Sequence, residues 1–521
     1  MNRKTLVSII FVAVIFVVGL GAVIITDIVN AYHPVKMNIS AAQLTTVSGN
    51  GGNAVIVGDY VYFVGNYVNT GDIKYKQNEY NKVKFGAIYR VKLTGAVPTY
   101  SDADMIETVP DYVQHHINDM QLIVPKIAGY DKSSLYVFGK YLIYTSPNNT
   151  KDKYGVLQTS KTDFFRVNLD GSDNKLVYTT SSDSVAKTDY TVACYGSSIY
   201  LLIKDGSNLN RVNVTGSAGK VDRISSAVTS FVLPIVSAYS GDGDKSLASS
   251  YGGVMNFVYY TEDLSQEDKD ANLTGNILKQ YRVTKGNGGG GNTEVVPHGN
   301  GTQFTVLALS GGRLLYSVIE DVSKLSGAQP HLYMTKDDSD ANSTDPFSSQ
   351  KRGNYLVLNG TEWSSSEQFS MPTERSFGTT DIIFLSQAAN PAGGNFIYIY
   401  AKAAADTSAA TLKKQVANVD SIIAITSSTA FYKSTGGEIM SVSLYGNDVP
   451  VGTGLTPDSL SDMSFFSQSG IGRIFYIKSF SGVSNTDASE TNCAMMIDLA
   501  TGKEYILGNL SDDYFQTVPG A

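Results

Sequence analysis

The sequence predicts an all-β fold, a β-propeller of about eight four-stranded antiparallel blades preceded by one N-terminal transmembrane helix. Three observations lead to this prediction: a recurring strand–turn–strand unit, a composition rich in strand and turn residues, and an apolar run near the start. The chain has 521 residues, including 33 Tyr and 49 Gly, and 17% of its residues are charged. Tyr favours pleated strands and Gly favours tight turns, so the composition is typical of a β protein and excludes a disordered chain.

The apolar run covers residues 6–25, with Arg3 and Lys4 before it and Asp27 after it. A helix of about 20 apolar residues spans the roughly 30 Å hydrocarbon core of a bilayer. Basic residues ahead of the run place the N-terminus in the cytoplasm and the rest of the chain outside. The alternative is a cleavable signal peptide ending near Ala31, although secretory apolar regions are shorter than this run.

These observations divide the chain into four parts. We predict a cytoplasmic stub at 1–5, a signal-anchor helix at 6–26, a linker at 27–50 and an extracytoplasmic β-propeller at 51–521. The other apolar runs have the length of strands, so a single membrane span is expected. The predicted location is the cell membrane, with the bulk of the chain extracellular.

The propeller prediction depends on an internal repeat. Each unit has a strand in which Tyr alternates with Val or Ile, a polar loop, and a second strand that reads aromatic, Arg, Val, any residue, Leu before a turn with Gly. The eight strand pairs are 58–65 with 86–95, 139–145 with 163–173, 198–204 with 208–216, 253–261 with 277–284, 312–318 with 331–336, 382–385 with 396–401, 428–433 with 438–444, and 472–478 with 493–499. An isolated hairpin is not stable, whereas radial stacking buries both faces of every blade.

Several alternatives stay open at this level. The ring could have seven blades, or the chain could form two packed β-domains divided near residue 250, or an open β-sandwich array. Two helices are expected as insertions between strands. The first covers residues 111–124, where Val113, Ile117, Met120 and Val124 share one helical face, and the second covers 411–419.

Residues 140–176 contain the strands KYLIYTS and FFRVNLDGSDNKL. This unit resembles the bacterial extracytoplasmic repeats related to the propeller modules of low-density-lipoprotein receptors, whose pattern is an I-Y-Y strand followed by L-Y-R-I-N-L-D-G-S. The resemblance implies a propeller of six to eight blades, display outside the cytoplasm, and a binding or scaffolding role. It implies no catalytic residue.

Charge and cysteine content restrict the partners and the compartment. Forty basic and 48 acidic residues give a net charge of −8 without a basic stripe, so we predict no nucleic-acid partner. A net negative surface also disfavours adsorption to anionic lipid, which leaves the apolar segment as the expected membrane contact. Cys194 and Cys493 lie in strand-like segments and are expected to be buried free thiols, a scarcity that fits the exterior of a Gram-positive-type bacterium.

No catalytic motif is predicted, and no catalytic or cofactor-binding residue is assigned. His115 and His116 are adjacent, but neighbouring residues on a helix point about 100° apart, which does not suit a metal pair. The glycine run at 286–291 lacks the Lys-Ser/Thr ending of a phosphate loop and is expected to be a flexible connection. The chain lacks the G-x-S-x-G elbow of an α/β-hydrolase and the aspartate boxes of sialidases.

One metal site is a candidate. Alternating carboxylate and amide oxygens can converge on calcium, and such a pattern occurs at Asp338, Asp340, Asn342 and Asp345. The glycine and the terminal glutamate of an EF-hand loop are missing, because Ser343 and Ser349 stand at those positions. A solvated acidic loop is the competing interpretation, and calcium is the single cofactor considered.

The sequence therefore favours a membrane-anchored extracytoplasmic propeller that binds or scaffolds a protein or glycan partner at the cell envelope. The alternative, from another class, is an anchored propeller hydrolase or lyase acting on extracellular or cell-wall polysaccharide, with carboxylates near the central channel. A sensor ectodomain is disfavoured because the predicted cytoplasmic part is only a few residues long.

Overall fold

The structure is a computed structural model that describes most of the chain after residue 32. The described residues are 33–45, 47–73, 86–93, 120–195, 197–233, 238–239, 257–283, 292–296, 298–310, 313–319, 330–335, 354–358, 362–364, 366–372, 381–403, 409–426, 428–454, 464–468, 471–480, 491–499 and 503–509. All structural statements below concern these residues.

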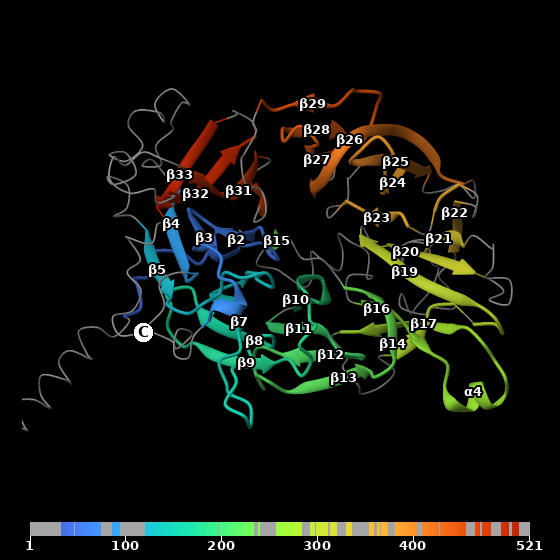
Figure 1. Cartoon of the computed structure of the whole chain (residues 1–521), viewed down its shortest axis with the longest axis horizontal. Coiled ribbons are helices and arrows are strands. Elements are labelled where there is room, and N and C mark those ends of the chain that lie inside the picture. Colours follow the sequence, from blue (N-terminus) through green and yellow to red (C-terminus); the bar gives the residue numbers. More distant parts are fainter. Residues whose placement is uncertain are drawn as a thin grey trace, which may run out of the picture.

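The described chain folds into antiparallel sheets that stand around a common centre, as in a β-propeller (Figure 1). Within each sheet the strands pair with their neighbours along the chain, so the path is a meander that leaves one sheet and enters the next. The arrangement confirms the all-β prediction and the radial stacking of hairpins.

Four sheets come from the first two thirds of the chain. In spatial order, the first is β15 (Ala238–Tyr239), β1 (Val47–Ser48), β2 (Ala54–Val57), β3 (Tyr60–Val64), β4 (Ile88–Lys92) and β5 (Gln121–Val124). The second is β6 (Tyr136–Phe138), β7 (Tyr141–Pro147), β8 (Thr162–Asn168) and β9 (Lys175–Thr179). The third is β10 (Tyr190–Tyr195), β11 (Ser198–Asp205), β12 (Asn208–Asn213) and β13 (Val221–Ser225). The fourth is β14 (Val228–Val232), β16 (Phe257–Asp263), β17 (Asn276–Arg282) and β18 (Asn292–Glu294).

Three further sheets complete the ring. The fifth is β19 (Gln303–Ser310), β20 (Arg313–Ile319), β21 (His331–Thr335) and β22 (Asn354–Leu358). The sixth is β23 (Gln368–Ser370), β24 (Asp381–Ala389), β25 (Asn395–Ala403), β26 (Thr411–Ile425), β27 (Thr429–Ser434), β28 (Ile439–Ser443) and β29 (Val451–Gly452). The seventh is β30 (Ser464–Gln468), β31 (Ile471–Phe480), β32 (Thr491–Asp498) and β33 (Lys503–Asn509). The short helices are η1 (Gln43–Thr45), η2 (Thr70–Asp72), η4 (Lys187–Asp189) and α4 (Gln266–Asp270).

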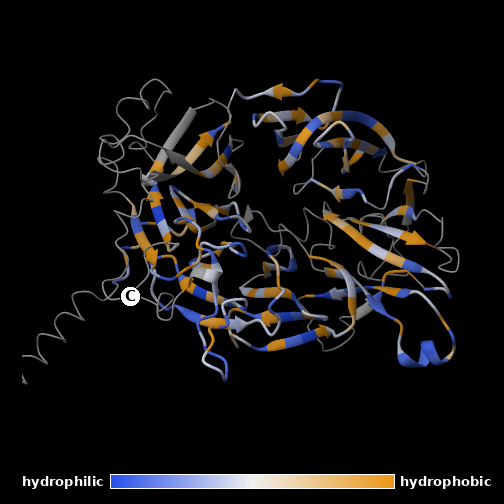
Figure 2. Ribbon diagram, in the orientation of Figure 1, coloured by the Kyte–Doolittle hydropathy of each residue, from blue (hydrophilic) through white to orange (hydrophobic). Residues whose placement is uncertain are grey.

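All eight hairpins predicted from the repeat are paired in the structure. They correspond to the pairs β3/β4, β7/β8, β11/β12, β16/β17, β20/β21, β24/β25, β27/β28 and β31/β32. Many central strands are buried on both faces, and Figure 2 shows hydrophobic residues concentrated along them while the α4 connection is hydrophilic. The aromatic and β-branched alternation therefore identified the strands because sheets packed face to face bury both sides.

The two predicted helices are wrong wherever the structure describes them. Residues 121–124 of the first form β5, which pairs with β4; residues 111–119 lie outside the described chain. The second lies within β26, where Val416 and Val419 are buried although they are three residues apart. Asn418 has φ +61 between them, and the pairing with β25 shifts register there. A β-bulge thus produced a spacing that imitates a helical face.

Adjacent sheets are joined by arginines of the third strand. The Nη1 of Arg166 donates to the carbonyl oxygen of Val214, which follows β12 in the next sheet, at 3.2 Å. Arg211, the equivalent residue one sheet further on, donates to the carbonyl of Val283, which follows β17. Each guanidinium also lies over a tyrosine ring of its own sheet, 4.8 Å from the centre of Tyr141 and 4.7 Å from that of Tyr200 respectively.

The first sheet uses the same arrangement with a tyrosine hydroxyl interposed. Arg90 lies 4.7 Å over the Tyr60 ring, and its Nη1 donates to the hydroxyl of Tyr62 at 3.1 Å. That hydroxyl donates to the carbonyl of Leu169, which follows β8 as Val214 follows β12. Arg90 is fully buried, and its stacking and hydrogen bonds offset the cost of removing a guanidinium from water. The repeated arginine of the sequence motif is therefore a contact between blades.

The beginning and the end of the described chain meet to close the ring. The Oγ of Ser464, the first residue of β30, accepts hydrogen bonds from the backbone N–H groups of Asn53 at 2.7 Å and Ala54 at 3.2 Å. A Cβ on Gly52 would lie 2.5 Å from the same oxygen, so this approach requires glycine. Phe63 and Phe475 pack across the same boundary with ring centres 5.5 Å apart.

Near the centre of the ring, β15 pairs with β1 (Figure 1). β15 belongs to the connection between the first two strands of the fourth sheet, whereas β1 precedes the first sheet. The two residues of β15, which come from the fourth sheet's connection, are thus paired with β1 beside the first sheet.

In the portion of the chain that the structure describes, no helix is long and apolar enough to cross a bilayer, and the predicted anchor at 6–26 lies outside that portion. Cys194 is a buried free thiol, as predicted. The side chain of Cys493 is outside the description.

The inter-blade arginine contact makes a testable prediction. We expect Arg211→Met to lower the free energy of unfolding by about 3–5 kcal/mol, because Asp222, which is ion-paired to Arg211, would keep its partly buried charge without this partner. Urea denaturation followed by circular dichroism measures the change.

Lys220→Met is the matched control, because it removes the other cation near the same carboxylate. Its Nζ is 4.0 Å from Asp222 and its side chain is 64% exposed. We expect a change within about 0.5 kcal/mol. Equal losses in the two variants would contradict the proposed importance of the arginine contact.

Candidate functional site

The predicted metal ligands cannot be placed. Asp338, Asp340, Asn342 and Asp345 lie outside the described residues, as do His115, His116 and the glycine run at 286–291. Within the described part of the chain, no three His, Cys, Asp or Glu side chains are grouped so that they could hold a metal ion. The calcium site stays a prediction.

Buried carboxylates occur where the second strand of a sheet ends, and they bind the chain itself. Asp205, at the end of β11, accepts hydrogen bonds from the backbone N–H groups of Ser181 and Ser182, both at 2.7 Å, and from the hydroxyl of Tyr178 at 2.7 Å. Ser181 and Ser182 belong to the connection that enters the third sheet from the second. Burial alone would raise the pKa of Asp205, but these hydrogen bonds hold it below its usual value.

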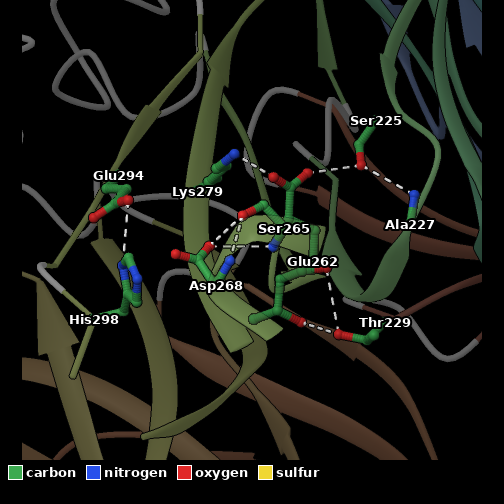
Figure 3. A network of polar contacts seen from close by, with 10 residues as sticks. Ser225, Ala227, Thr229, Glu262, Ser265, Asp268, Lys279, Glu294 and His298 are labelled. Atoms are coloured by element: carbon green, nitrogen blue, oxygen red, sulfur yellow. Dashed lines mark hydrogen bonds and ion pairs between the residues drawn. The ribbon is translucent and has the colours of Figure 1, made fainter. Parts of the chain in front are cut away.

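Glu262 occupies the corresponding end of β16 in the next sheet (Figure 3). Its carboxylate forms an ion pair with Lys279 and accepts a hydrogen bond from the Ser225 hydroxyl at 2.8 Å, again at the entry from the preceding sheet. The neighbouring pairs in Figure 3 are local: Asp268 accepts from Ser265 at the start of α4, and Glu294 faces His298 at 3.3 Å. Each of these carboxylates is bound by side chains of its own neighbourhood.

Asp163 is a third buried carboxylate, and it holds the base of a long connection. Burial raises the pKa of Asp163, against the opposing effect of hydrogen bonds from Asn148 and Thr179. The Nδ2 of Asn148 donates to the Oδ1 of Asp163 at 2.8 Å, and the hydroxyl of Thr179 donates to the same oxygen at 2.7 Å. Asn148 is the first residue after β7, so this contact fixes where the loop to β8 begins.

The loop between β7 and β8, residues 148–161, is an ordered hairpin that we call the β7–β8 hairpin. Near its base the backbone N–H of Asn148 donates to the carbonyl of Lys161 at 2.9 Å, and that of Gln158 donates to the carbonyl of Thr150 at 2.9 Å. At its tip the Oδ1 of Asp152 accepts the backbone N–H groups of Tyr154 and Val156 at 2.8 and 2.9 Å. The carboxylate thus adds to the backbone hydrogen bonds that Asp152 forms with Val156 and Gly155, and it helps to determine the shape of the turn.

The tip of the β7–β8 hairpin exposes apolar side chains. Tyr154 is 78% exposed and Val156 is 62% exposed, the former with the Lys153 amine 4.8 Å from its ring centre. Between them, Gly155 has φ +84, which only glycine adopts without strain. A pre-ordered loop that presents an aromatic side chain loses little conformational entropy on binding, and exposed aromatic residues are typical anchors of protein interfaces.

Sequence reasoning did not identify this hairpin, because most tyrosines alternate with Val and Ile in strands and packing was their expected role. The local signal was present in Asp152-Lys153-Tyr154-Gly155, where an aspartate followed by a glycine three residues later favours a turn. This local sequence does not indicate that the side chain of Tyr154 is exposed.

No protein-family model matches the chain, and no curated protein sequence does. Among solved structures the chain is similar to prolyl oligopeptidase B from Galerina marginata, with 11% identity, a TM-score of 0.37, and coverage of 88% of this chain and 56% of that one. It is also similar to an uncharacterized protein from Listeria monocytogenes, with 10% identity, a TM-score of 0.32, and coverage of 71% and 91%. A chain of a nidogen–laminin complex is a third, with 9% identity, a TM-score of 0.24, and coverage of 64% and 91%.

The chain spans about half the length of the prolyl endopeptidases that it matches. Likenesses of this degree assign no activity. The class of protein follows from the structure itself: an all-β propeller built from repeated antiparallel sheets. The resemblance of residues 140–176 to extracytoplasmic receptor-like repeats stays a prediction.

The carboxylate at the blade junction gives a pH-dependent prediction. We expect Asp205→Asn to lower the free energy of unfolding at pH 7 by about 2 kcal/mol, because buried donors lose a charged acceptor. The folded-state pKa of Asp205 lies below the unfolded value near 3.9. The stabilisation is therefore complete above about pH 5 and is lost as the pH falls through the folded-state pKa.

Thermal unfolding of the variant and the wild type between pH 3 and pH 7 tests this expectation, and the difference in Tm is expected to shrink below about pH 4. Asp183→Asn, an exposed carboxylate in the same connection, serves as the control and should leave Tm unchanged. A Tm difference for Asp205→Asn that is constant across this range would refute the assigned role of its charge.

Proposed function

We propose that this protein is a single-pass, membrane-anchored extracytoplasmic β-propeller of eight blades that binds a protein or glycan partner at the cell envelope. The blade number follows from dividing the seven-stranded sheet at β26. Residues Thr411 to Val419 of that strand pair with β25, and Val419 to Ile425 pair with β27. One strand therefore ends one four-stranded unit and begins the next, and eight such units result.

The observation that carries the binding role is the β7–β8 hairpin. Its backbone is hydrogen-bonded from base to tip, yet its tip buries neither Tyr154 nor Val156. An apolar pair held rigidly in water is unfavourable for an isolated protein and is typical of a surface that a partner covers.

The envelope location is supported by the sequence. The apolar run at 6–25 is long enough for a bilayer, and the basic residues before it favour an outward-facing propeller.

The test uses the full chain in nanodiscs, incubated with the envelope fraction of the source organism and, separately, with a glycan array. We expect Tyr154→Ser with Val156→Ser to lower binding of the captured ligand at least about tenfold, as expected when an interface loses an aromatic anchor worth about 2 kcal/mol. Tm should stay within about 2 °C because both side chains are exposed.

Leu176→Ser with Val221→Ser is the matched control, since it removes two exposed apolar side chains, 54% and 44% exposed, from the strands β9 and β13. This control should bind as the wild type does. Binding that is equally weakened in both double variants, or unaffected in both, would refute the hairpin as the contact. Absence of any ligand from both sources would refute the binding role.

A further inference from the structure

The β7–β8 hairpin ends in a tight turn whose backbone is hydrogen-bonded to itself. The backbone N–H of Asp152 donates to the carbonyl of Val156 at 2.8 Å, and that of Gly155 donates to the carbonyl of Asp152 at 3.0 Å. One step nearer the base, Lys151 and Leu157 form an antiparallel bridge. The side chains of the turn are therefore held at the tip of a fixed two-stranded ribbon.

Contacts at the base fix the hairpin to two other connections. Lys132, in the connection before β6, donates from its Nζ to the carbonyls of Ser160 at 2.7 Å and Asp183 at 3.0 Å. Asp183 belongs to the connection that enters the third sheet. Together with the hydrogen bond from Asn148 to Asp163, these contacts fix the direction of the hairpin as well as its shape.

The exposed charges of the hairpin are positive. Lys151 and Lys153 are exposed and Lys161 is half-buried, whereas Asp152 is the single acidic residue between 148 and 161. Three lysines and one aspartate give this segment, which is described in full, a net charge of +2 in a chain of net charge −8. The Oδ1 of Asp152 is already engaged by two backbone N–H groups of the turn.

Lys153 also orients the aromatic side chain. Its Nζ lies 4.8 Å from the centre of the Tyr154 ring, which is the distance of a cation–π contact. The ammonium group occupies one face of the ring and leaves the rest of it to water, since Tyr154 is 78% exposed. With Val156 also exposed, the tip presents an apolar pair with two ammonium groups beside it.

These features favour a protein partner over a glycan. A sugar is bound by donors and acceptors that match its hydroxyl groups, whereas the exposed side chains of the tip are two ammonium groups, one phenol and one isopropyl group. They stand out from the turn, so they suit insertion into a pocket better than enclosure of a ligand. An aromatic anchor with charged residues around it is the usual anatomy of a protein interface.

We propose that the hairpin tip inserts Tyr154 and Val156 into an apolar pocket of a partner protein, and that the rim of this pocket carries carboxylates opposite Lys151 and Lys153. This inference rests on the binding role in the proposed function and names the class of the partner. Opposite charges at a rim raise the rate of encounter, whereas the buried apolar pair slows dissociation. The net negative charge of the chain repels an acidic partner, so the local charge of the tip is needed for approach.

The experiment uses the full chain in nanodiscs with photoreactive p-benzoylphenylalanine in place of Val156, which keeps an apolar side chain beside Tyr154. Irradiation with the envelope fraction of the source organism links the tip covalently to the molecule that it contacts. We expect an adduct that protease digests and that periodate, which cleaves sugar diols, leaves intact. Raising the salt from about 0.1 M to about 1 M, where the Debye length falls from about 10 Å to about 3 Å, should lower the adduct yield at least about fivefold.

Charge reversal is the decisive variant, because capture of a protein counts only if it depends on the tip lysines. Lys151→Glu with Lys153→Glu should lower the adduct yield at least about tenfold. Lys151→Arg with Lys153→Arg keeps the charge and the cation–π contact and should preserve the yield. Lys92→Glu with Lys413→Glu is the matched control, since it changes the net charge equally at two exposed lysines outside the hairpin, and it should keep the yield within about twofold.

The partner's carboxylates are tested from the other side. Treatment of the envelope fraction with carbodiimide and glycinamide converts carboxylates to neutral amides. This treatment should lower the adduct yield as much as the reversal of the two tip lysines does. The Tm of each lysine variant should stay within about 2 °C of the unsubstituted chain, because the substituted side chains are exposed.

The outcomes separate this inference from the proposed function. An adduct that resists protease and yields to periodate, or a yield that ignores salt and the tip lysines, would refute the acidic protein partner and leave the hairpin as the contact. Equal losses in the tip reversal and the matched control would refute the local role of the tip charge. No adduct, together with binding on the glycan array that needs Tyr154, would refute this inference alone. Absence of any ligand from both sources would refute both.

Discussion

The ring depends on a repeated contact in which a third-strand arginine is held between a tyrosine of its own sheet and a backbone carbonyl of the next. Sheets that pack face to face through apolar side chains can slide past one another, because dispersion contacts are not directional. A guanidinium bound to one carbonyl is directional, so Arg166 fixes the second sheet against the third and Arg211 fixes the third against the fourth. At the opposite end of the strands, Asp205 and Glu262 each bind the segment through which the chain enters from the preceding sheet. Both ends of a blade are thereby fixed.

This framework explains why the connections can vary. The buried charges described near the blade junctions are bound by the chain itself, so they belong to the architecture. What is left for recognition is on the loops. The β7–β8 hairpin has its own hydrogen bonds and is fixed at its base by Asp163, which lets Tyr154 be both exposed and ordered. The proposed binding role depends on this ordered loop with its exposed aromatic side chain.

The sequence predicted the strands well and the helices poorly, for one physical reason. The alternation of aromatic and β-branched residues reports burial in a pleated strand, and all eight hairpins inferred from it are paired. In β26 a bulge at Asn418 changes the alternation, so Val416 and Val419 are buried with a helical spacing. Periodicity within a short window cannot distinguish a bulged strand from a helix, because the distinction lies in pairing with a distant strand.

By itself the sequence determined the all-β composition, the repeat, the recurring arginine and the apolar N-terminal run, since each is encoded in local order. The tertiary structure alone decided that Ser464 meets Asn53 across the ring and that β15 pairs with β1. It also left Tyr154 in solvent. Residue type and local order are properties of the sequence, whereas these contacts join positions far apart in the sequence that only the pairing and stacking of strands bring together.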